Sequence, residues 1–138
     1  MDRTRVCEIM ETKVVTISAG DSLSTVEDIM TLGHLRHIPV VRGGVLVGVV
    51  SERDLLRVSL SNLTDFGRDQ RRAFLHAVAI ERVMSKPPTV IEPDATVVKA
   101  ARVLAEARIG CLPVLEGEKL VGLITETDLL RHFAGSPQ

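Results

Sequence analysis

The stretch IPVVRGGVLVGVVSERDLLR at residues 38–57 recurs as LPVLEGEKLVGLITETDLLR at residues 112–131. The match extends without a gap over residues 10–57 and 84–131, a shift of 74 positions. A chain that repeats itself in this way builds one structural unit twice. We therefore expect two related units, with an interface between them and a pair of related clefts at that interface.

Each copy shows the same succession of local patterns. A short β-branched run precedes a turn, and a segment with apolar residues at helical spacing follows. A proline-containing strand then leads through a tight turn into a stronger strand and a last helix, so the predicted order is β-α-β-β-α, twice. The predicted ranges are strands 14–17 and 89–91, helical segments 23–30 and 97–104 with Ser22 and Thr96 as N-caps, strands 38–41 and 112–115, strands 45–50 and 120–124, and helices that start at Ser51 and Thr125.

The repeat also predicts the domain organisation. Repeat 1 covers residues 1–58, a connector covers residues 59–79, and repeat 2 covers residues 80–138. Units of this size bury too little surface to be stable alone. We therefore expect both repeats to fold as one body.

The connector has no counterpart in the other repeat. Its residues 65–79 predict a helix with Thr64 or Asp65 as the N-cap. One face of this helix is basic, since cations recur there at helical spacing: Arg68, Arg71, Arg72 and His76. Two interpretations stay open, namely a solvated face and a contact to phosphate or to a partner chain.

Composition and charge exclude several classes of protein. Hydrophobic residues make up 45% of the chain, with no Trp and no Tyr, so the core must be aliphatic. The net charge of −1 gives no general attraction to nucleic acid or to an anionic membrane. No apolar run approaches the ~20 residues that span a bilayer, and no signal segment follows Met1. We therefore expect a cytoplasmic protein that needs neither membrane nor nucleic acid.

The sequence predicts neither catalysis nor a metal site. Cys7 and Cys111 form no CxxC motif and read as free thiols. Cys111 lacks a base that the sequence would reveal, and the four histidines show no metal-ligand spacing. We expect a protein that is not an enzyme.

The most specific motif is Gly-x-x-Ser/Thr-x-x-Asp, at residues 48–54 and 122–128. One interpretation is a helix capping box, in which the acidic side chain folds back on the N-cap amide. The other is a ligand site, because a carboxylate can accept both hydroxyls of a cis-diol and a helix N-terminus attracts phosphate. The hydroxyl can cap the helix while the carboxylate faces a ligand, so the two interpretations are compatible.

These residues resemble a known family. The sequences His-Ile-Pro-Val-Val and Gly-Val-Val-Ser-Glu-Arg-Asp-Leu-Leu of the first copy are similar to a CBS domain, and Leu-Pro-Val-Leu with Gly-Leu-Ile-Thr-Glu-Thr-Asp-Leu-Leu of the second copy is similar too. The pair resembles a stand-alone CBS pair, or Bateman module, over essentially the whole chain. The resemblance implies an α+β fold in which two β-α-β-β-α repeats pack sheet to sheet around a pseudo-two-fold axis.

The resemblance also implies a function. Such pairs bind AMP, ADP, ATP, S-adenosylmethionine or NAD(H) in the clefts between the repeats, with no obligatory cofactor and with or without Mg²⁺. They commonly form homodimers, discs of four CBS units, and regulate an attached or partner protein. The alternative is a module without ligand that serves only for dimerisation or protein interaction.

Site residues follow from the family's pattern, in which the Asp meets the ribose, the Ser or Thr lies beside the ribose-phosphate, and the adenine pocket comes from the other repeat. The cleft of Asp128 would contain Thr125, Thr127, Val15, Thr16, Leu35, Arg36, His37, Ile38 and Pro39. The cleft of Asp54 would contain Ser51, Arg53, Thr89, Val90, Ile109, Gly110, Cys111, Leu112 and Pro113. Val15, Val90 and Ile109 are equally open to a simple core role.

The two predicted clefts differ in charge. Arg36 and His37 of the first repeat align with Gly110 and Cys111 of the second. The resemblance implies that basic residues near this place contact phosphate, so the cleft near Arg36 and His37 should favour phosphorylated ligands. Arg53, which aligns with Thr127, is a second candidate phosphate contact.

Overall fold

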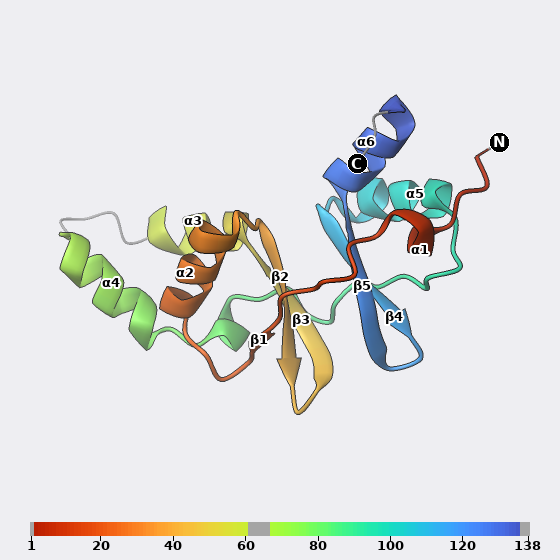
Figure 1. The fold of residues 1–138 in the computed structure, drawn as a ribbon. Helices are drawn as coiled ribbons and strands as arrows, with labels where there is room; N and C mark the ends of the chain where they lie inside the picture. Colours follow the sequence, from red (N-terminus) through yellow and green to blue (C-terminus); the bar gives the residue numbers. More distant parts are fainter. Residues whose placement is uncertain (1, 61–66, 136–138) are drawn as a thin grey trace. The chain divides into compact units, whose positions relative to one another are not determined.

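The computed structural model describes residues 2–60 and 67–135. The chain divides into two compact units, which we describe separately. The central unit is Val15–Pro88, and the terminal unit combines Met1–Val14 with Thr89–Gln138. Each unit contains one β-hairpin with helices around it, as the repeat predicted (Figure 1).

The central unit contains a three-stranded sheet in the order β1-β2-β3. Strand β1 pairs with β2 in parallel, and β2 pairs with β3 in antiparallel. Its elements are β1 (Ile17–Ser18), α2 (Leu23–Gly33), β2 (His37–Arg42), β3 (Val45–Ser51), α3 (Glu52–Leu60), α4 (Arg68–Ala77) and the 3₁₀ helix η1 (Ile80–Arg82).

The terminal unit repeats this pattern around the hairpin β4-β5. Its elements are α1 (Val6–Ile9), α5 (Val97–Ala107), β4 (Cys111–Glu116), β5 (Lys119–Thr125) and α6 (Glu126–Ala134). The strand predicted at residues 89–91 is reduced to a single parallel bridge between Ile91 and Val114. The reason is Pro93. Its counterpart in the first copy, Ala19, donates its amide to the Val41 carbonyl at 2.9 Å, and Pro93 has no amide hydrogen with which to form the equivalent bond.

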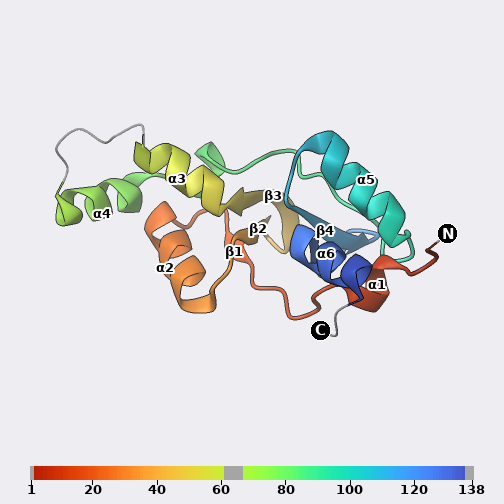
Figure 2. The ribbon, with the colours of Figure 1, turned by 90° about the horizontal axis from the view of Figure 1, so that it is seen from above.

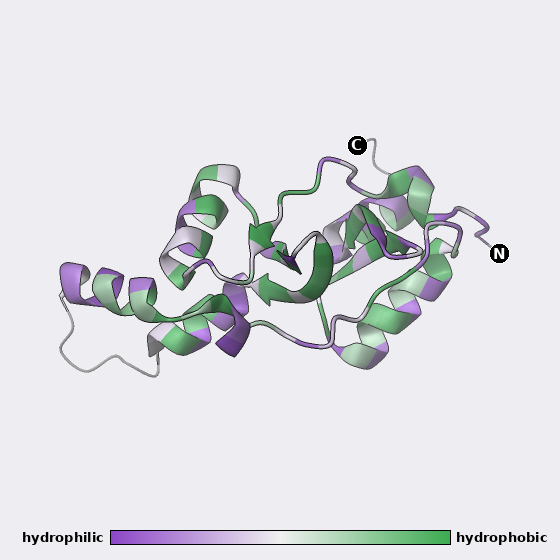
Figure 3. Cartoon of the chain, turned by 90° about the horizontal axis from the view of Figure 1, so that it is seen from below, coloured by the Kyte–Doolittle hydropathy of each residue, from purple (hydrophilic) through white to green (hydrophobic). Residues whose placement is uncertain are grey.

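Each unit has its own aliphatic core. Figure 3 shows the strands as the most hydrophobic segments and the helices with one apolar and one polar side. In the central unit, Ile38, Val40 and Val50 of the sheet are fully buried against Leu23 and Val26 of α2. The same packing holds in the terminal unit, whose fully buried side chains include Val97, Leu112, Val114 and Ile124.

The segment at the start of each sequence copy packs in the compact unit that contains the hairpin of the other copy. Met10, at the start of the first sequence copy, lies in the terminal unit, and Met84, at the start of the second, lies in the central unit. Glu11 pairs with Leu123 through two backbone hydrogen bonds of 2.8 and 2.9 Å, and Ser85 pairs with Val49 in the same way at 3.2 and 2.9 Å. The compact units therefore do not coincide with the ranges 1–58 and 80–138.

The connector helix is α4, which lies beside α2 (Figures 1 and 2). It begins at Arg68 and ends at Ala77, within the predicted range 65–79. The predicted caps Thr64 and Asp65 lie outside the described residues. Gly67 is the N-cap, and its amide donates to Gln70 Oε1 at 3.1 Å. Leu75 of α4 is fully buried in the core of the central unit.

Candidate functional site

The Ser/Thr-x-x-Asp motif forms a reciprocal capping box at the start of α3. The amide and the hydroxyl of Ser51 both donate to Asp54 Oδ2, at 2.8 and 2.9 Å. The Asp54 amide donates to Ser51 Oγ at 3.1 Å. These bonds satisfy amides that have no partner within the helix. The capping interpretation of the motif is therefore correct for the first repeat.

The second repeat builds the same box at the start of α6. The Thr125 amide and hydroxyl donate to Asp128 Oδ2 at 2.9 and 3.0 Å, and the Asp128 amide donates to Thr125 Oγ1 at 3.2 Å. In both repeats the box uses Oδ2, while Oδ1 takes no part in it. Because an ionised carboxylate has four acceptor positions, each half-buried aspartate keeps acceptor capacity outside the box.

The sheet brings a second segment to each helix start. In the central unit, His37 of β2 pairs with Ser51, and the Glu52 amide donates to the Arg36 carbonyl at 2.8 Å. In the terminal unit, Cys111 of β4 pairs with Thr125, and the Glu126 amide donates to the Gly110 carbonyl at 3.0 Å. The residues just before β2 and β4 therefore lie beside the motif of their own repeat.

The same arrangement carries different side chains in the two units. In the central unit it presents the exposed Arg36 and Arg53 with the half-buried His37. In the terminal unit the counterparts are Gly110, Thr127 and the buried Cys111, so none is a cation. Burial raises the pKa of the Cys111 thiol to about 12. A thiol with this pKa stays protonated at neutral pH and is a poor nucleophile.

The remaining predicted residues fall into three groups by exposure. Val15 and Val90 are 45% and 38% exposed, and Thr16 and Thr89 beside them are exposed. The core interpretation of Val15 and Val90 is thus wrong. Leu35 and Ile109 are half-buried, while the hairpin residues are core residues: Ile38, Pro39, Leu112 and Pro113. Val15, Thr16, Thr89 and Val90 are not part of the hydrogen-bonded arrangement described above.

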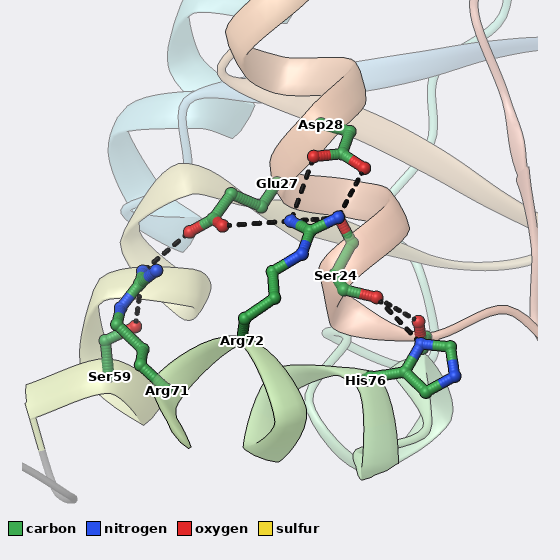
Figure 4. Close-up of polar contacts among 8 residues, drawn as sticks. Ser24, Glu27, Asp28, Ser59, Arg71, Arg72 and His76 are labelled. Carbon is green, nitrogen blue, oxygen red and sulfur yellow. Dashed lines mark hydrogen bonds and ion pairs between the residues drawn. The ribbon is translucent and has the colours of Figure 1, made fainter. Parts of the chain in front are cut away.

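Two arginines of the basic face of α4 form ion pairs within the central unit. Arg72 binds Asp28 of α2 through two bonds of 2.9 and 2.7 Å (Figure 4). Arg71 donates to Glu27 at 2.6 Å and to Ser59 at 3.2 Å. These guanidinium groups have carboxylates of their own chain as partners and are still 43% and 46% exposed, so both interpretations of the connector stay predictions.

A sequence signal for this pairing was present. The second copy has Ala101 and Arg102 where α2 has Glu27 and Asp28, so the acidic pair occurs only in the repeat that the connector helix follows. His76, four residues after Arg72, lies 3.3 Å from Ser24 Oγ of α2 through its Nδ1 (Figure 4). The side chain of Arg68 lies outside the described part of the structure.

Two kinds of feature are absent from the described residues. Within residues 2–60 and 67–135, no group of three or more His, Cys, Asp or Glu side chains is placed to hold a metal ion. Across the same residues, no helix combines the length and the apolar character that crossing a membrane requires.

Comparison with known proteins gives two matches to one family. A sequence model of the CBS domain matches residues 6–61 and again residues 80–135. A CBS domain-containing protein of Dictyostelium discoideum is 28% identical over 91% of this chain and 88% of its own length. The protein YhcV of Bacillus subtilis is 29% identical over 90% of this chain and 81% of its own length.

Solved structures share the fold. A signal-transduction protein with CBS domains from Burkholderia ambifaria is 25% identical with a TM-score of 0.84, over 98% of this chain and 97% of that one. The CBS domain pair of protein MJ0100, in complex with 5′-methylthioadenosine and S-adenosyl-L-methionine, is 23% identical with a TM-score of 0.80, over 96% and 97%. CBSX2 in complex with AMP is 22% identical with a TM-score of 0.78, over 96% and 97%.

Other relatives are longer than this chain. The chain spans 43% of an uncharacterized protein of Thermofilum pendens, with 32% identity. It spans 21% of an inosine-5′-monophosphate dehydrogenase of Korarchaeum cryptofilum, with 28% identity. The matched region therefore occurs both as most of a small protein and as a minor part of larger ones.

Proposed function

The chain belongs to the CBS-domain family, and on this premise we propose that it is a regulatory module that binds an adenosyl compound at its Ser/Thr-x-x-Asp motifs. The observation that carries the proposal is the duplicated arrangement at the starts of α3 and α6. There a carboxylate with acceptor capacity outside its capping box, a hydroxyl and a helix N-terminus lie together. Two proteins of the same fold bind 5′-methylthioadenosine with S-adenosyl-L-methionine, and AMP.

The chemistry of an adenosyl ligand suits this arrangement. Oδ1 of Asp54 or Asp128 accepts hydrogen bonds from the two ribose hydroxyls, while Oδ2 keeps the helix capped. A 5′-phosphate gains from the positive end of the helix dipole. Ligand binding then shifts the population of conformations that a partner protein reads. The chain itself performs no reaction in this proposal, and it acts in the cytoplasm as a homodimer.

The two motifs should differ in ligand class. Backbone contacts bring Arg36 and His37 to the start of α3, beside Arg53 and the motif of Asp54, whereas the family's pattern assigns them to the cleft of Asp128. On these contacts the motif of Asp54 should favour a phosphorylated ligand such as AMP, ADP or ATP, with Mg²⁺ for the triphosphate. The start of α6 offers no cation at the matching positions. It should therefore tolerate an uncharged 5′ group, such as that of 5′-methylthioadenosine.

A titration panel tests the proposal. AMP, ADP, ATP, S-adenosylmethionine, 5′-methylthioadenosine and NADH are each titrated by calorimetry and by thermal unfolding, with and without Mg²⁺. A ligand at about 100 times its Kd adds about 2.7 kcal/mol to the free energy of unfolding. Asp54→Ala and Asp128→Ala should each lower affinity for the ligand of their own repeat by about tenfold or more, because a charge-assisted hydrogen bond is lost.

A matched control separates binding from capping. Thr96→Ala removes the N-cap of α5, whose hydroxyl accepts from the Lys99 amide at 3.1 Å, and leaves the motif intact. Like Asp128→Ala, it should cost about 1 kcal/mol of stability. Only Asp128→Ala should weaken binding. Equal affinities in the two variants would show that Asp128 only caps the helix.

The second candidate function is dimerisation or protein interaction without a ligand. It is favoured by the capping box itself, because a complete structural role for Ser51 and Asp54 leaves no need for a ligand. Leu56 and Leu130, 54% and 67% exposed at equivalent positions of α3 and α6, would then serve as contact residues. This alternative would be established by two results together. No ligand of the titration panel would bind or raise the unfolding temperature at millimolar concentration, and the protein would form a dimer in solution that Leu130→Ser disrupts.

A further inference from the structure

An ion pair closes the terminal unit across nearly the whole length of the sequence. Asp2 Oδ2 lies 2.6 Å from Nε2 of His132, which is in the last turns of α6. The other carboxylate oxygen, Oδ1, accepts from the Thr4 amide at 2.9 Å. Both side chains are partly shielded from solvent, with 31% of Asp2 and 22% of His132 exposed. The two side chains are therefore less exposed than a typical pair of surface charges.

The fold does not require this pair, because the other repeat lacks it. One residue beyond the ungapped match, the first copy has Val58 where the second copy has His132. Val58 packs against the core of the central unit. The Asp2–His132 pair is thus an addition to one of two otherwise similar units.

The pair fastens an N-terminal segment, residues 2–11, that is also held by backbone bonds and by apolar contacts, since Ile9 and Met10 pack against the core of the terminal unit. The Val97 amide donates to the Thr4 carbonyl at 2.8 Å, and the Cys7 amide donates to the Pro93 carbonyl at 3.0 Å. Val6 is fully buried in the core of the terminal unit. We call residues 2–11 the N-terminal strap.

His132, the second member of the pair, lies on α6, the helix that also carries Asp128. His132 follows Asp128 by four residues, about one turn of α6. A change in the interaction between Asp2 and His132 therefore acts on the same helix whose first turn forms the Thr-x-x-Asp motif. The strap and the motif are in this way connected through a single helical turn.

We propose that Asp2 and His132 form a proton-operated latch, which closes the N-terminal strap onto α6 when the imidazole is charged and loosens when it is neutral. A histidine changes charge between pH 8 and pH 5, whereas a carboxylate does not. The hydrogen bond from the Thr4 amide, together with those from the Thr4 and His132 side chains, lowers the pKa of Asp2 to about 2. Asp2 thus stays ionised throughout this window, and the imidazole alone operates the latch.

The surroundings of His132 leave Asp2 as its charged partner. Among the described residues, Asp2 provides the carboxylate within ion-pair distance of His132. Helix α6 packs against α1, α5 and β5. The titratable or charged residues on these elements and on α6 are Cys7, Glu8, Lys99, Arg102, Glu106, Lys119, Glu126, Asp128 and Arg131. In the part of the chain that the structure describes, no ion pair joins the carboxylates of Glu8 or Asp128 to the imidazole of His132, whose ion pair is with Asp2.

Hydrogen–deuterium exchange of the whole protein without ligand tests the latch. Exchange of the amides of residues 3–8 is measured at pH 5.5 and pH 8.0 and corrected for the intrinsic effect of pH. The wild-type strap should be about three- to tenfold better protected at pH 5.5. Asp2→Asn and His132→Gln should each abolish this difference. The matched control His76→Gln, which removes a histidine bond in the central unit, should leave it unchanged.

The outcomes are decisive for the latch and independent of the proposed function. Equal protection of the wild-type strap at both pH values, or a pH dependence that persists in Asp2→Asn, would overturn the latch. A loss of protection in Asp2→Asn that is the same at both pH values would reduce the pair to a structural contact. The link to the motif rests on the proposed function. It predicts that the affinity of AMP or 5′-methylthioadenosine depends on pH in the wild type and not in Asp2→Asn.

Discussion

At the scale of single residues, two glycines are required by two methionines. A Cβ built on Gly48 would lie 2.6 Å from the sulfur of Met84, and a Cβ on Gly122 would collide with the sulfur of Met10. Real Cβ atoms do not approach other atoms this closely. Both glycines lie inside strands, where glycine is otherwise unfavourable, so the close approach of a methionine explains their presence in both copies.

Gly122→Ala should therefore destabilise the terminal unit. We expect a loss of about 1–3 kcal/mol, the usual cost of inserting a methyl group into a packed site, measured by denaturant unfolding. Gly20→Ala is the matched control, since its nearest neighbour beyond the turn is Ser18 Oγ at 3.9 Å. In the double variant Met10→Ala with Gly122→Ala, the two costs should be less than additive. Full additivity would contradict the packing explanation.

The Ser/Thr-x-x-Asp motif shows how far a short motif can be interpreted. Its spacing is typical of a capping box, and the structure contains the box in both repeats. The same spacing is also compatible with ribose binding. The two roles use different atoms of one carboxylate, and no sequence pattern distinguishes Oδ1 from Oδ2. The second role of Asp54 and Asp128 stays a prediction for this reason.

At the scale of elements, α4 is held on α2 by an apolar contact and a set of ion pairs. Leu75 is fully buried, whereas Arg71 and Arg72 are about half exposed. Exposed ion pairs add little stability, and burial of a leucine adds much. The apolar contact therefore supplies the energy, and the ion pairs select which face of α2 the helix covers.

Leu75→Ala should destabilise the central unit far more than Arg72→Ala does. The expected cost for Leu75→Ala is about 2–5 kcal/mol, because a fully buried leucine leaves a cavity. Arg72→Ala should give a small decrease in the unfolding midpoint that disappears in high salt. Leu32→Ala is the control, since Leu32 is 83% exposed. A larger effect of Arg72→Ala than of Leu75→Ala would mean that charge, not burial, holds α4.

The Arg72–Asp28 bond also predicts a dependence on pH. The bond from Arg72 holds the pKa of Asp28 below its ordinary value. Because the unfolded chain has the higher pKa, the contribution of Asp28 is complete above that ordinary value, near 3.8, and is lost as pH falls through the lowered pKa. The stability difference between wild type and Arg72→Ala should stay constant from pH 8 to pH 5. It should then shrink below about pH 4, where a difference that persists would exclude this bond as its cause.

Elements differ in how well their sequence predicted them. The hairpins and the last helices were predicted because their pattern occurs twice in the sequence. The structure gives both hairpins the same register, with Pro39 paired to Val49 and Pro113 paired to Leu123. The helix α1 was not predicted, since four residues contain too little periodicity. The strand predicted at residues 89–91 is longer than the single bridge that the structure contains. Pro93 cannot donate a backbone hydrogen bond to the neighbouring strand, and the sequence alone does not show where that bond would be needed.

At the scale of the whole molecule, sequence repeats and compact units are offset. A shift of the sequence against itself reveals similarity, but it carries no information on which copy a flanking segment packs with. Residues 1–14 therefore counted as part of repeat 1, whereas Val6 and the bridge from Glu11 to Leu123 place them in the terminal unit. The sequence repeats include the flanking segments, whereas each compact unit takes its flanking segment from the other repeat.

This offset gives a prediction that distinguishes units from repeats. Val6→Ala should destabilise the terminal unit by about 1–3 kcal/mol, because it removes two methyl groups from a closed core. Amide exchange should then rise in residues 111–125, which are far away in sequence, and not in residues 37–51 of the same sequence repeat. Val15→Ala, at an exposed position nine residues later, is the control and should change neither range. If exchange instead rose in residues 37–51, the N-terminal strap would belong with the repeat it precedes, and the division of the chain into a central and a terminal unit would be wrong.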